Sequence, residues 1–389
     1  MFTEEVLINL VFFNQSYLIQ PEIIAAFRRV PGVRVIVLDI APHPDGAQAR
    51  RAAEILQEHS CGMLLTVNEW GFDSEGILHD YIDSAGLLHI NWCVDDPFYE
   101  EIILTKKFIP SVRRIDFVSD RDYIAAMHAR GYNAHFLPLA VDPQLFSPCG
   151  NGFTSDCVFV GNSYLSQIDE FTRGAEPLLD TMMPLLAKIM QRYYRDATVD
   201  VAGEVELYLA SAGSVPGIPR AKAAFIAKHF AGFLFRKKIV GTLLSEIPGF
   251  YVYGDDGWLE MAGRERLRKV RYDKALNEVY ATTKVNIDIN RVVIRNGFTQ
   301  RIFDTLASGA FVITSAKPIV EELFVTGGAH REVATFASAE ELTEKVRYYL
   351  AHEDERVAIA ARGREKVLAA HTYDHRVREM FRVVAEQFR

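Results

Sequence analysis

The N-terminal part of the chain alternates between short apolar runs and longer amphipathic stretches. Each run is almost continuously hydrophobic, which is typical of strands in a parallel sheet that helices cover on both faces. The intervening residues 45–59 are rich in Ala, Arg and Glu and have the periodicity of a helix. This alternation predicts a doubly wound α/β domain. The six apolar runs span 6–13, 33–40, 61–68, 87–95, 114–120 and 134–140.

A proline- and glycine-rich stretch at 139–152 interrupts the pattern. Such residues break both helices and strands, so a domain boundary is predicted near residue 150. A second alternation then predicts another α/β domain, giving an N-terminal domain of residues 1–150 and a C-terminal domain of residues 151–372. The terminal helix, 373–389, is expected to pack on the N-terminal domain. The apolar runs of the second domain span 156–162, 250–256, 284–290, 310–315 and 332–336.

Residues 163–249 separate the first two predicted strands of the second domain and have a helical pattern. The segment is much longer than a simple crossover, so an insertion of several helices is predicted. Within it, residues 220–238 interleave basic and aromatic residues. Two interpretations fit: a helix that buries its aromatic side in the protein, which we favour, or a basic amphipathic helix that lies on a membrane surface.

Composition and charge narrow the classes of function. The chain has 389 residues, of which 49% are hydrophobic and 24% charged, as in globular proteins with a sizeable core. A formal net charge of −8 argues against nucleic acid as a partner. The four cysteines form no CxxC pair, and the N-terminus lacks the basic region of a signal peptide. We expect a cytoplasmic protein, with peripheral contact at the inner membrane face as the alternative.

The segment from Asn296 to Gly309, NGFTQRIFDTLASG, carries the clearest chemistry. It follows a predicted strand, and ligands of open α/β sheets bind beyond the carboxyl ends of the strands. A helix is expected to begin within 299–301, so backbone N–H groups next to Gly297 would face a diphosphate at the positive end of the helix dipole. Asp304 is placed to accept hydrogen bonds from ribose hydroxyls. Three arginines add positive charge nearby: Arg291, Arg295 and Arg301.

This segment resembles the signature of the group 1, family 4-like glycosyltransferases, in which two acids flank a glycine-containing loop in the pattern E-x7-E. Asn296 stands at the first acid position and Asp304 at the second. VDPQLFSP followed by VFVGN resembles the connection between the two domains of those enzymes. VNEWGFDSEG, INWCVDDPF and HTYDHRV resemble their spore-maturation CgeB-like branch. The resemblance covers most of the chain outside 163–249.

The resemblance implies the GT-B architecture, in which two Rossmann-like domains face each other across a cleft. It implies transfer of a sugar from a nucleoside-diphosphate sugar to a glycan, lipid-linked or protein acceptor hydroxyl, with retention of configuration. The backbone of Gly297, Phe298 and Thr299 would bind phosphate, and Asp304 the ribose. Asn296 would lie near the donor sugar without supplying the negative charge of a carboxylate. No cofactor is implied beyond the donor substrate.

Other strand ends supply further candidates. Asp95 and Asp96 follow an apolar run, and one of them is expected to orient or deprotonate the acceptor hydroxyl unless both only cap a turn. The acceptor side is expected to include Asn14, Asn68 and Glu69. The donor side is expected to include Gly161, Asn162, Tyr253 and Gly254, although a plain strand-end turn explains the Gly161-Asn162 pair equally well.

Two patterns suggest a metal, and a simpler explanation is preferred for each. Asp120-Arg121-Asp122 has the DxD spacing of metal-dependent transferases, but Asp120 is expected to cap a helix. His371 and His375 are four residues apart without a third ligand, so packing and capping are preferred. No metal is therefore expected. Two other functions stay open: a GT-B-shaped sugar-nucleotide epimerase or hydrolase, and a two-lobe ligand-binding protein without enzymatic activity.

Overall fold

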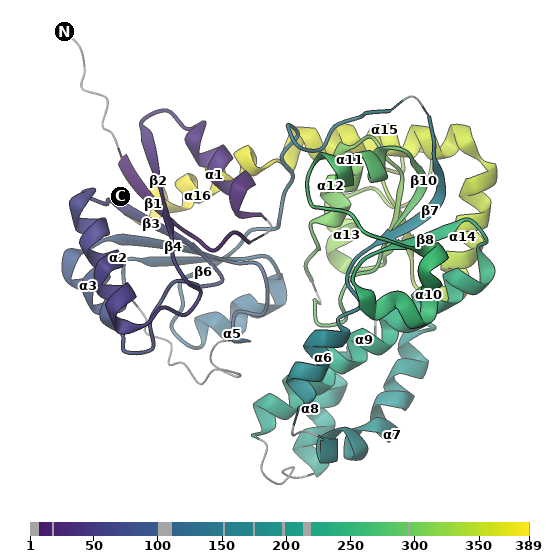
Figure 1. The fold of residues 1–389 in the computed structure, drawn as a ribbon, viewed down its shortest axis with the longest axis horizontal. Helices are drawn as coiled ribbons and strands as arrows, with labels where there is room; N and C mark the ends of the chain where they lie inside the picture. Colours follow the sequence, from purple (N-terminus) through teal and green to yellow (C-terminus); the bar gives the residue numbers. More distant parts are fainter. Residues whose placement is uncertain are drawn as a thin grey trace. The chain divides into compact units, whose positions relative to one another are not determined.

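The computed structural model describes residues 8–17, 19–99, 111–150, 152–173, 176–196, 199–212, 219–294 and 296–388. The chain divides into two α/β units (Figure 1). Unit 1 comprises the residues up to Ala140 together with those from His371 onward, and unit 2 comprises Val141–Ala370. This division lies a little before the boundary predicted near residue 150, because Lys274 Nζ donates to Leu145 O (2.8 Å) and thereby ties this stretch to unit 2.

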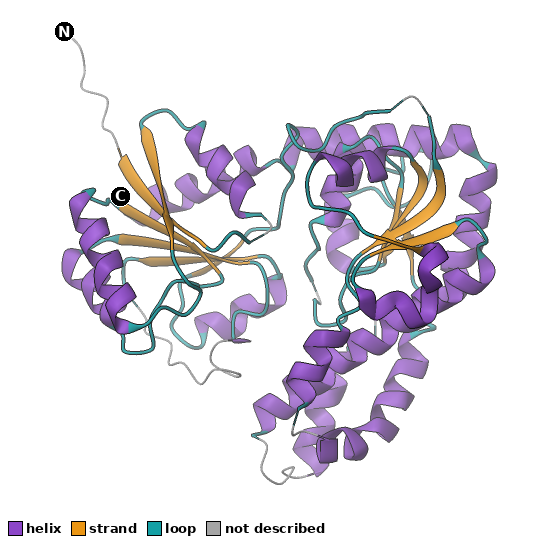
Figure 2. Cartoon of the chain, viewed as in Figure 1, coloured by secondary structure: helices purple, strands orange, loops and turns teal. Residues whose placement is uncertain are grey.

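Unit 1 is built on six parallel strands in the order β2-β1-β3-β4-β5-β6. The strands are β1 (Ile8–Asn14), β2 (Val33–Asp39), β3 (Met63–Val67), β4 (Leu88–Cys93), β5 (Arg114–Val118) and β6 (Ala134–Phe136). Helices cover both faces of the sheet (Figure 2). They are α1 (Gln20–Arg28), α2 (Gly46–Glu58), α3 (Ile77–Ala85), α5 (Ile124–His128) and α16 (Tyr373–Gln387). The C-terminal helix α16 packs against α1, with Phe27 and Phe381 edge to face at 5.8 Å.

Unit 2 has a second six-stranded parallel sheet, in the order β12-β11-β10-β7-β8-β9. The strands are β7 (Ser155–Val160), β8 (Phe250–Tyr253), β9 (Leu267–Arg268), β10 (Thr283–Asp288), β11 (Val312–Ser315) and β12 (Ala334–Phe336). Only β9 lacks a counterpart among the predicted apolar runs, because two residues are too few to form a pattern. The helices after β8 are α10 (Leu259–Arg266), α11 (Lys274–Ala281), α12 (Arg301–Ala307), α13 (Pro318–Leu323), α14 (Ala339–Ala351) and α15 (Glu353–Ala370).

The predicted insertion between β7 and β8 contains four described helices: α6 (Leu165–Thr172), α7 (Glu176–Tyr193), α8 (Val201–Ala212) and α9 (Arg220–Glu246). The long helix α9 packs against the other three and against β8. Its buried face shares one hydrophobic core with residues of β7, β8 and β10. Within the described ranges, no helix is both long enough and apolar enough to span a bilayer.

Each sheet has one point where the strand order reverses. In unit 1 the chain leaves β1 toward β2 on one side and returns to β3 on the other. In unit 2 the same reversal separates β7 from β10. Loops diverge at such points and leave a crevice at the carboxyl ends of the two strands, where open α/β sheets bind ligands. The topology therefore places one candidate crevice in each unit.

Close packing of α15 on α12 generates the first prediction. A Cβ atom at Gly363 would lie 2.4 Å from Glu332 O and 2.6 Å from Leu306 Cδ2. Helix propensity alone favours alanine by about 1 kcal/mol, whereas overpacking costs about 1–3 kcal/mol. We expect Gly363→Ala to lower the free energy of unfolding, measured by urea denaturation, and Gly327→Ala, which has open space, to leave it unchanged. A more stable Gly363→Ala protein would contradict this packing.

Candidate functional site

Asp288 organises the crevice of unit 2. It is the last residue of β10 and is 1% exposed. Its carboxylate accepts hydrogen bonds from Arg301 Nε (2.9 Å), Thr299 Oγ1 (3.0 Å) and Thr314 Oγ1 (2.7 Å). Burial lowers the pKa of Arg301, but Asp288, with Tyr164 and Tyr280, raises the pKa overall, so the guanidinium stays charged.

Three arginines, which we call the arginine cluster, gather at this crevice: Arg236, Arg291 and Arg301. Arg236 comes from α9, is 2% exposed, and donates to the backbone carbonyls of Asn162 (2.8 Å) and Ile289 (3.1 Å). Arg301 also donates to Ile289 O (2.9 Å). Within the described part of the chain, Arg236 forms no ion pair with a carboxylate, and burial lowers its pKa to about 10.

The cluster therefore carries more positive than negative charge. Arg291 donates from Nε to the Tyr164 hydroxyl (2.9 Å), and the Arg236 guanidinium lies 4.4 Å from the centre of the Tyr164 ring. Arg301 is matched by Asp288. Guanidinium groups that converge on one strand end are the usual ligands of phosphate and diphosphate groups. The net positive charge of the arginine cluster matches that of an anion such as a diphosphate.

Two glycines allow the loops around this site to approach each other. A Cβ atom at Gly161 would lie 2.7 Å from the Phe159 ring and 3.3 Å from Arg301 Nη1. A Cβ atom at Gly254 would lie 2.4 Å from Gly161 O. Trp258 Nε1 donates to the same carbonyl (2.9 Å). Gly161 and Gly254 thus serve the packing of the two strand ends, while the exposed Asn162 contributes its carbonyl to Arg236.

Tyr253 lies at the end of β8 but lines a different space. This cavity, of about 530 Å³, is formed with Lys269, with residues of α11 and with the start of β7. The Tyr253 side chain thus faces this cavity, while its backbone carbonyl accepts a hydrogen bond from Gly161 N (2.8 Å).

The loop predicted to bind phosphate is tied down by side chains. Thr299 N donates to Asn290 Oδ1 (3.3 Å), and its hydroxyl bonds to Asp288. Phe298 is 2% exposed and packs edge to face on Phe303 at 5.5 Å. Gly297 is buried, Asn296 is half-buried, and Arg295 lies outside the described residues. Because α12 begins only at Arg301, a phosphate role for the backbone of 297–299 remains a prediction.

Asp304 lies within α12 and is 1% exposed. Its carboxylate accepts a hydrogen bond from the Tyr272 hydroxyl (3.1 Å), which also bonds to the Gln300 side chain. Tyr272 belongs to the segment between β9 and α11. Asp304 therefore connects α12 with a neighbouring strand end, and its predicted role in binding ribose stays a prediction.

Asp95 follows β4 in unit 1 and joins residues that come after β1 and β3. Its Oδ2 accepts hydrogen bonds from Asn68 Nδ2 (3.0 Å) and from the Tyr17 hydroxyl (3.3 Å). Asn68 Oδ1 in turn accepts from the backbone N of Val94 (2.8 Å), so the amide holds both the loop and the carboxylate. Tyr17 also packs edge to face on Trp70, with ring centres 4.9 Å apart. Asn14 is the last residue of β1, and its Nδ2 donates to Asp39 Oδ1 (2.5 Å).

The structure separates the two neighbouring aspartates. Asp96 Oδ1 accepts from the backbone N of Phe98 (2.9 Å), which is the turn-capping role. Asp95 instead belongs to the side-chain group with Asn68 and Tyr17. Of the two, only Asp95 is therefore joined by described contacts to the acceptor-side candidates.

Asn68 and Glu69 both have left-handed backbone conformations, with φ of 55° and 57°. Such conformations are uncommon for residues other than glycine and persist only where the surroundings enforce them. Glu69 is held by a bidentate ion pair with Arg114, with both N–O distances 2.8 Å. Glu69 N also donates to Asn91 Oδ1 (2.8 Å). These contacts fix the turn that aims Asn68 at Asp95.

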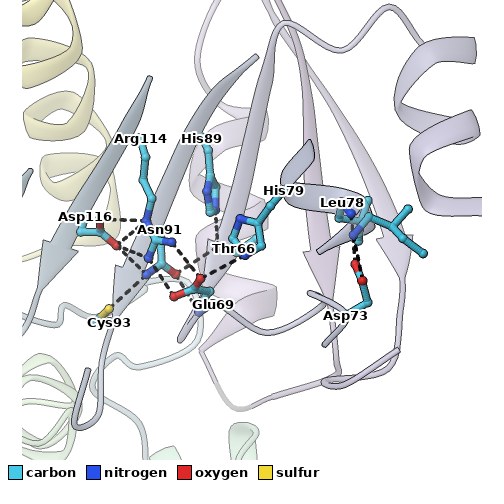
Figure 3. Close-up of polar contacts among 11 residues, drawn as sticks. Thr66, Glu69, Asp73, Leu78, His79, His89, Asn91, Cys93, Arg114 and Asp116 are labelled. Atoms are coloured by element: carbon cyan, nitrogen blue, oxygen red, sulfur yellow. Dashed lines mark hydrogen bonds and ion pairs between the residues drawn. The ribbon is translucent and has the colours of Figure 1, made fainter. Parts of the chain in front are cut away.

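A buried polar network holds Glu69 in this turn (Figure 3). Arg114, 2% exposed, also pairs with Asp116 (2.7 Å), and Asn91 Nδ2 donates to Asp116 Oδ1 (2.9 Å). Burial raises the pKa of Asp116, against the opposite effect of Arg114. Arg114, Asn91 and Asp116 were not among the residues predicted from the sequence. The signal that could have found them is a pair of polar residues at alternate positions in each of two apolar runs, HIN in β4 and RID in β5.

The residues of the two sequence patterns that suggested a metal make other contacts in the structure. Asp120 accepts from the backbone N of Asp122 (3.1 Å), as a capping residue does. His371 Nδ1 lies 2.9 Å from Arg376 Nη2, and His375 Nδ1 lies 2.6 Å from Thr372 Oγ1. In the part of the chain that the structure describes, no three His, Cys, Asp or Glu side chains are grouped as metal ligands.

The basic and aromatic stretch 220–238 lies on α9. Phe225 and Phe235 are each 1% exposed, whereas Lys237 and Lys238 face solvent. Arg236, between these groups, points inward to the carbonyls of Asn162 and Ile289. Two of the four phenylalanines of the stretch are thus inside the protein, whereas Phe230 and Phe233 are half-buried.

Comparisons with known proteins agree with this architecture. Residues 236–382 match a family model described as glycosyl transferase-like, which is less than half of the chain and begins at Arg236. No curated protein matches the chain. Among solved structures, sucrose-phosphate synthase from Thermosynechococcus elongatus is similar with a TM-score of 0.58 and 9% identity, covering 98% of this chain and 99% of that one.

Two further solved structures are similar over nearly their full length. HepE from Anabaena, in complex with UDP-glucose, has a TM-score of 0.56 and 9% identity, covering 97% of this chain and 99% of that one. A glycosyltransferase from Rickettsia africae has a TM-score of 0.52 and 11% identity, covering 98% and 99%. With two Rossmann-like units matched in this way, the chain has the GT-B fold.

The buried His89 generates a prediction about the stability of unit 1 in acid. His89 is 3% exposed and lies 2.9 Å from Thr66 Oγ1; burial, with Arg114 and His79, lowers its pKa well below the usual range. A histidine whose folded-state pKa is lowered stabilises the fold while neutral. This contribution is fully present above the unfolded pKa of about 6.5 and is lost as the pH falls below it, by up to about 1.4 kcal/mol per pH unit.

We therefore expect hydrogen exchange of β3 to β5, corrected for intrinsic rates, to show a loss of protection between about pH 7 and pH 5. His89→Gln should flatten this pH dependence, whatever its effect on stability at neutral pH. His43→Gln, at an exposed histidine of the same unit, is the matched control. Equal pH dependence in the wild type and in His89→Gln would show that His89 does not titrate in this way.

Proposed function

We propose that the protein is a glycosyltransferase that moves a sugar from a nucleoside-diphosphate sugar to an acceptor hydroxyl. The observation that carries the proposal is the arginine cluster at the strand reversal of unit 2. The glycosyl transferase-like match supports it, because residues 236–382 include all three arginines, the loop before α12, and Asp304. A sugar nucleotide as donor agrees with the UDP-glucose bound by HepE, whose fold is similar.

The chemistry of the reaction explains why cations are needed. When the bond between the sugar and the diphosphate breaks, negative charge develops on the departing diphosphate. Cationic groups that are already fixed near the departing diphosphate oxygen stabilise the transition state without having to reorganise. Arg236 and Arg301 are fixed by the carbonyl of Ile289 and by Asp288, so they meet this requirement. Asp304 would accept from the ribose, and Asn296 would hydrogen-bond the donor sugar as a neutral group.

The crevice of unit 1 supplies the acceptor chemistry. Asp95 would orient the acceptor hydroxyl or remove its proton, because Asn68 and Tyr17 hold its carboxylate at the strand ends. Asp96 is left out of this role because it caps the following turn. Retention of configuration and a role in polysaccharide, glycolipid or protein glycosylation are proposed on the resemblance alone. Contact of 220–238 with a membrane would involve the exposed lysines of α9 and the half-buried Phe230 and Phe233, because Phe225 and Phe235 are buried.

Arg236 offers a direct test of the donor site. Arg236→Met should weaken binding of UDP-, GDP-, dTDP- or ADP-sugars by about 10- to 100-fold, which corresponds to one hydrogen-bonded charge. Lys238→Met removes the same charge from an exposed position of the same helix and should not change affinity. Isothermal titration calorimetry provides the measurement, with circular dichroism as the check of folding. If no nucleotide sugar binds the wild type more tightly than about 1 mM, the proposal is wrong.

Asp95 tests the chemistry separately from donor binding. Asp95→Asn should lower the rate of sugar release from the bound donor, to water or to an added acceptor, by about 10²- to 10⁴-fold. Donor affinity should stay unchanged, because Asp95 belongs to unit 1. Asp96→Asn is the matched control and should retain most of the turnover. Equal losses in the two variants would remove Asp95 from the catalytic role, and release to water alone would indicate a hydrolase.

A further inference from the structure

Tyr164 has no role so far, although it lies inside the arginine cluster. It directly precedes α6 and has a left-handed backbone conformation, with φ of 64°. This conformation is rare for a large side chain and costs about 1–3 kcal/mol, so the surroundings must enforce it. In this conformation the centre of the Tyr164 ring lies 4.4 Å from the Arg236 guanidinium and 5.2 Å from the Arg291 guanidinium. The residue as a whole is half-buried.

The charged groups around Tyr164 come from four elements. Arg236 belongs to α9, Arg291 follows β10 and Arg301 begins α12. Two carboxylates lie nearby, and both are engaged: Asp288 pairs with Arg301, and Asp255 accepts from the backbone N (2.9 Å) and hydroxyl (3.0 Å) of Ser163. The Tyr164 oxygen thus faces mainly cations, and it accepts a hydrogen bond from Arg291 Nε.

This surrounding charge changes the acidity of the hydroxyl. Burial alone raises the pKa of Tyr164, but Arg291, Arg236 and Arg301 together outweigh it and lower the pKa to about 7. The neutral hydroxyl is a hydrogen-bond donor, whereas the ionised oxygen is only an acceptor and carries the same sign of charge as a phosphate. The two protonation states therefore have opposite effects on an anion that enters the cluster.

We propose that Tyr164 is a ligand of the donor diphosphate and makes donor binding pH-sensitive. The neutral hydroxyl donates to a phosphoryl oxygen, and the ionised oxygen occupies the cluster as an internal counter-ion and opposes the donor. The inference rests on the proposed function, because it names the diphosphate as the anion. Binding to the ionised form requires uptake of one proton from solvent, which forms the O–H bond of Tyr164.

The sign of the pH dependence follows from this linkage. Donor affinity is constant below about pH 7 and falls by up to about tenfold for each pH unit above it. The probe is UDP-glucose, together with GDP-, dTDP- and ADP-glucose, because both phosphates are esterified and their charge stays constant between about pH 6 and pH 8.5. Calorimetry in buffers of different ionisation enthalpy measures both the affinity and the proton uptake.

The test compares the full chain with Tyr164→Phe and Tyr251→Phe. Phenylalanine keeps the ring stacked on Arg236 but removes the ionisable oxygen, while Tyr251 is a tyrosine of β8 whose ring lies 4.8 Å from the Arg268 guanidinium. Tyr164→Phe should bind the nucleotide sugar about 3- to 10-fold more weakly than the wild type at pH 6, for one lost hydrogen bond. Its affinity should not change with pH and should exceed that of the wild type at about pH 8.5. Tyr251→Phe should behave as the wild type.

A second measurement does not depend on the donor. The near-ultraviolet absorbance of tyrosinate should reveal one group that ionises near neutral pH in the wild type and in Tyr251→Phe, but not in Tyr164→Phe. If nucleotide sugars bind the wild type and Tyr164→Phe with the same affinity at every pH, this inference is overturned and the proposed function stands. If no nucleotide sugar binds at any pH, the proposed function and this inference both fail. Absence of the neutral titration would also overturn the inference.

Discussion

The carboxylate of Asp288 is the interaction on which the site in unit 2 depends. It ends β10 at the point where the strand order reverses, and it holds Arg301, Thr299 and Thr314 at once. Through these bonds one buried charge fixes the start of α12, the loop before it and the end of β11. Burying a single carboxylate is favourable only when it is paired and hydrogen-bonded, so the loop geometry and the charge of Arg301 require each other.

The two units have the same sheet topology but gather side chains of opposite charge at the ends of their strands. In each sheet the polar groups collect where two connections diverge, since packing alone leaves space there. Unit 2 fills that space with guanidinium groups held by carbonyls, and unit 1 fills it with a carboxylate held by an amide and a phenol. A leaving diphosphate needs cations, and a hydroxyl that must lose a proton needs an acceptor.

Sequence periodicity predicted the fold well because strands and helices of a doubly wound domain have strong local patterns. It placed Arg291 and Arg301 together, since Arg291 directly follows the predicted strand 284–290 and Arg301 begins the next helix. It could not distinguish Arg236 from Lys237 and Lys238. The three residues lie within one turn of α9, and only the exact helix orientation determines which side chain faces inward. It also could not assign Asp95 and Asp96 different roles. Both lie in a turn, and hydrophobic periodicity does not predict which way a side chain points in a turn. Tyr164 was missed because its position depends on three arginines distant in sequence.

The position of Arg236 on α9 has a consequence for engineering of the chain. The helical insertion supplies one of the three arginines of the cluster and shares a core with β7, β8 and β10. The insertion is therefore not an independent module that can be exchanged or trimmed while the arginine cluster persists. Any rearrangement of α6 to α8 that rotates α9 would change the distribution of positive charge at the end of β10.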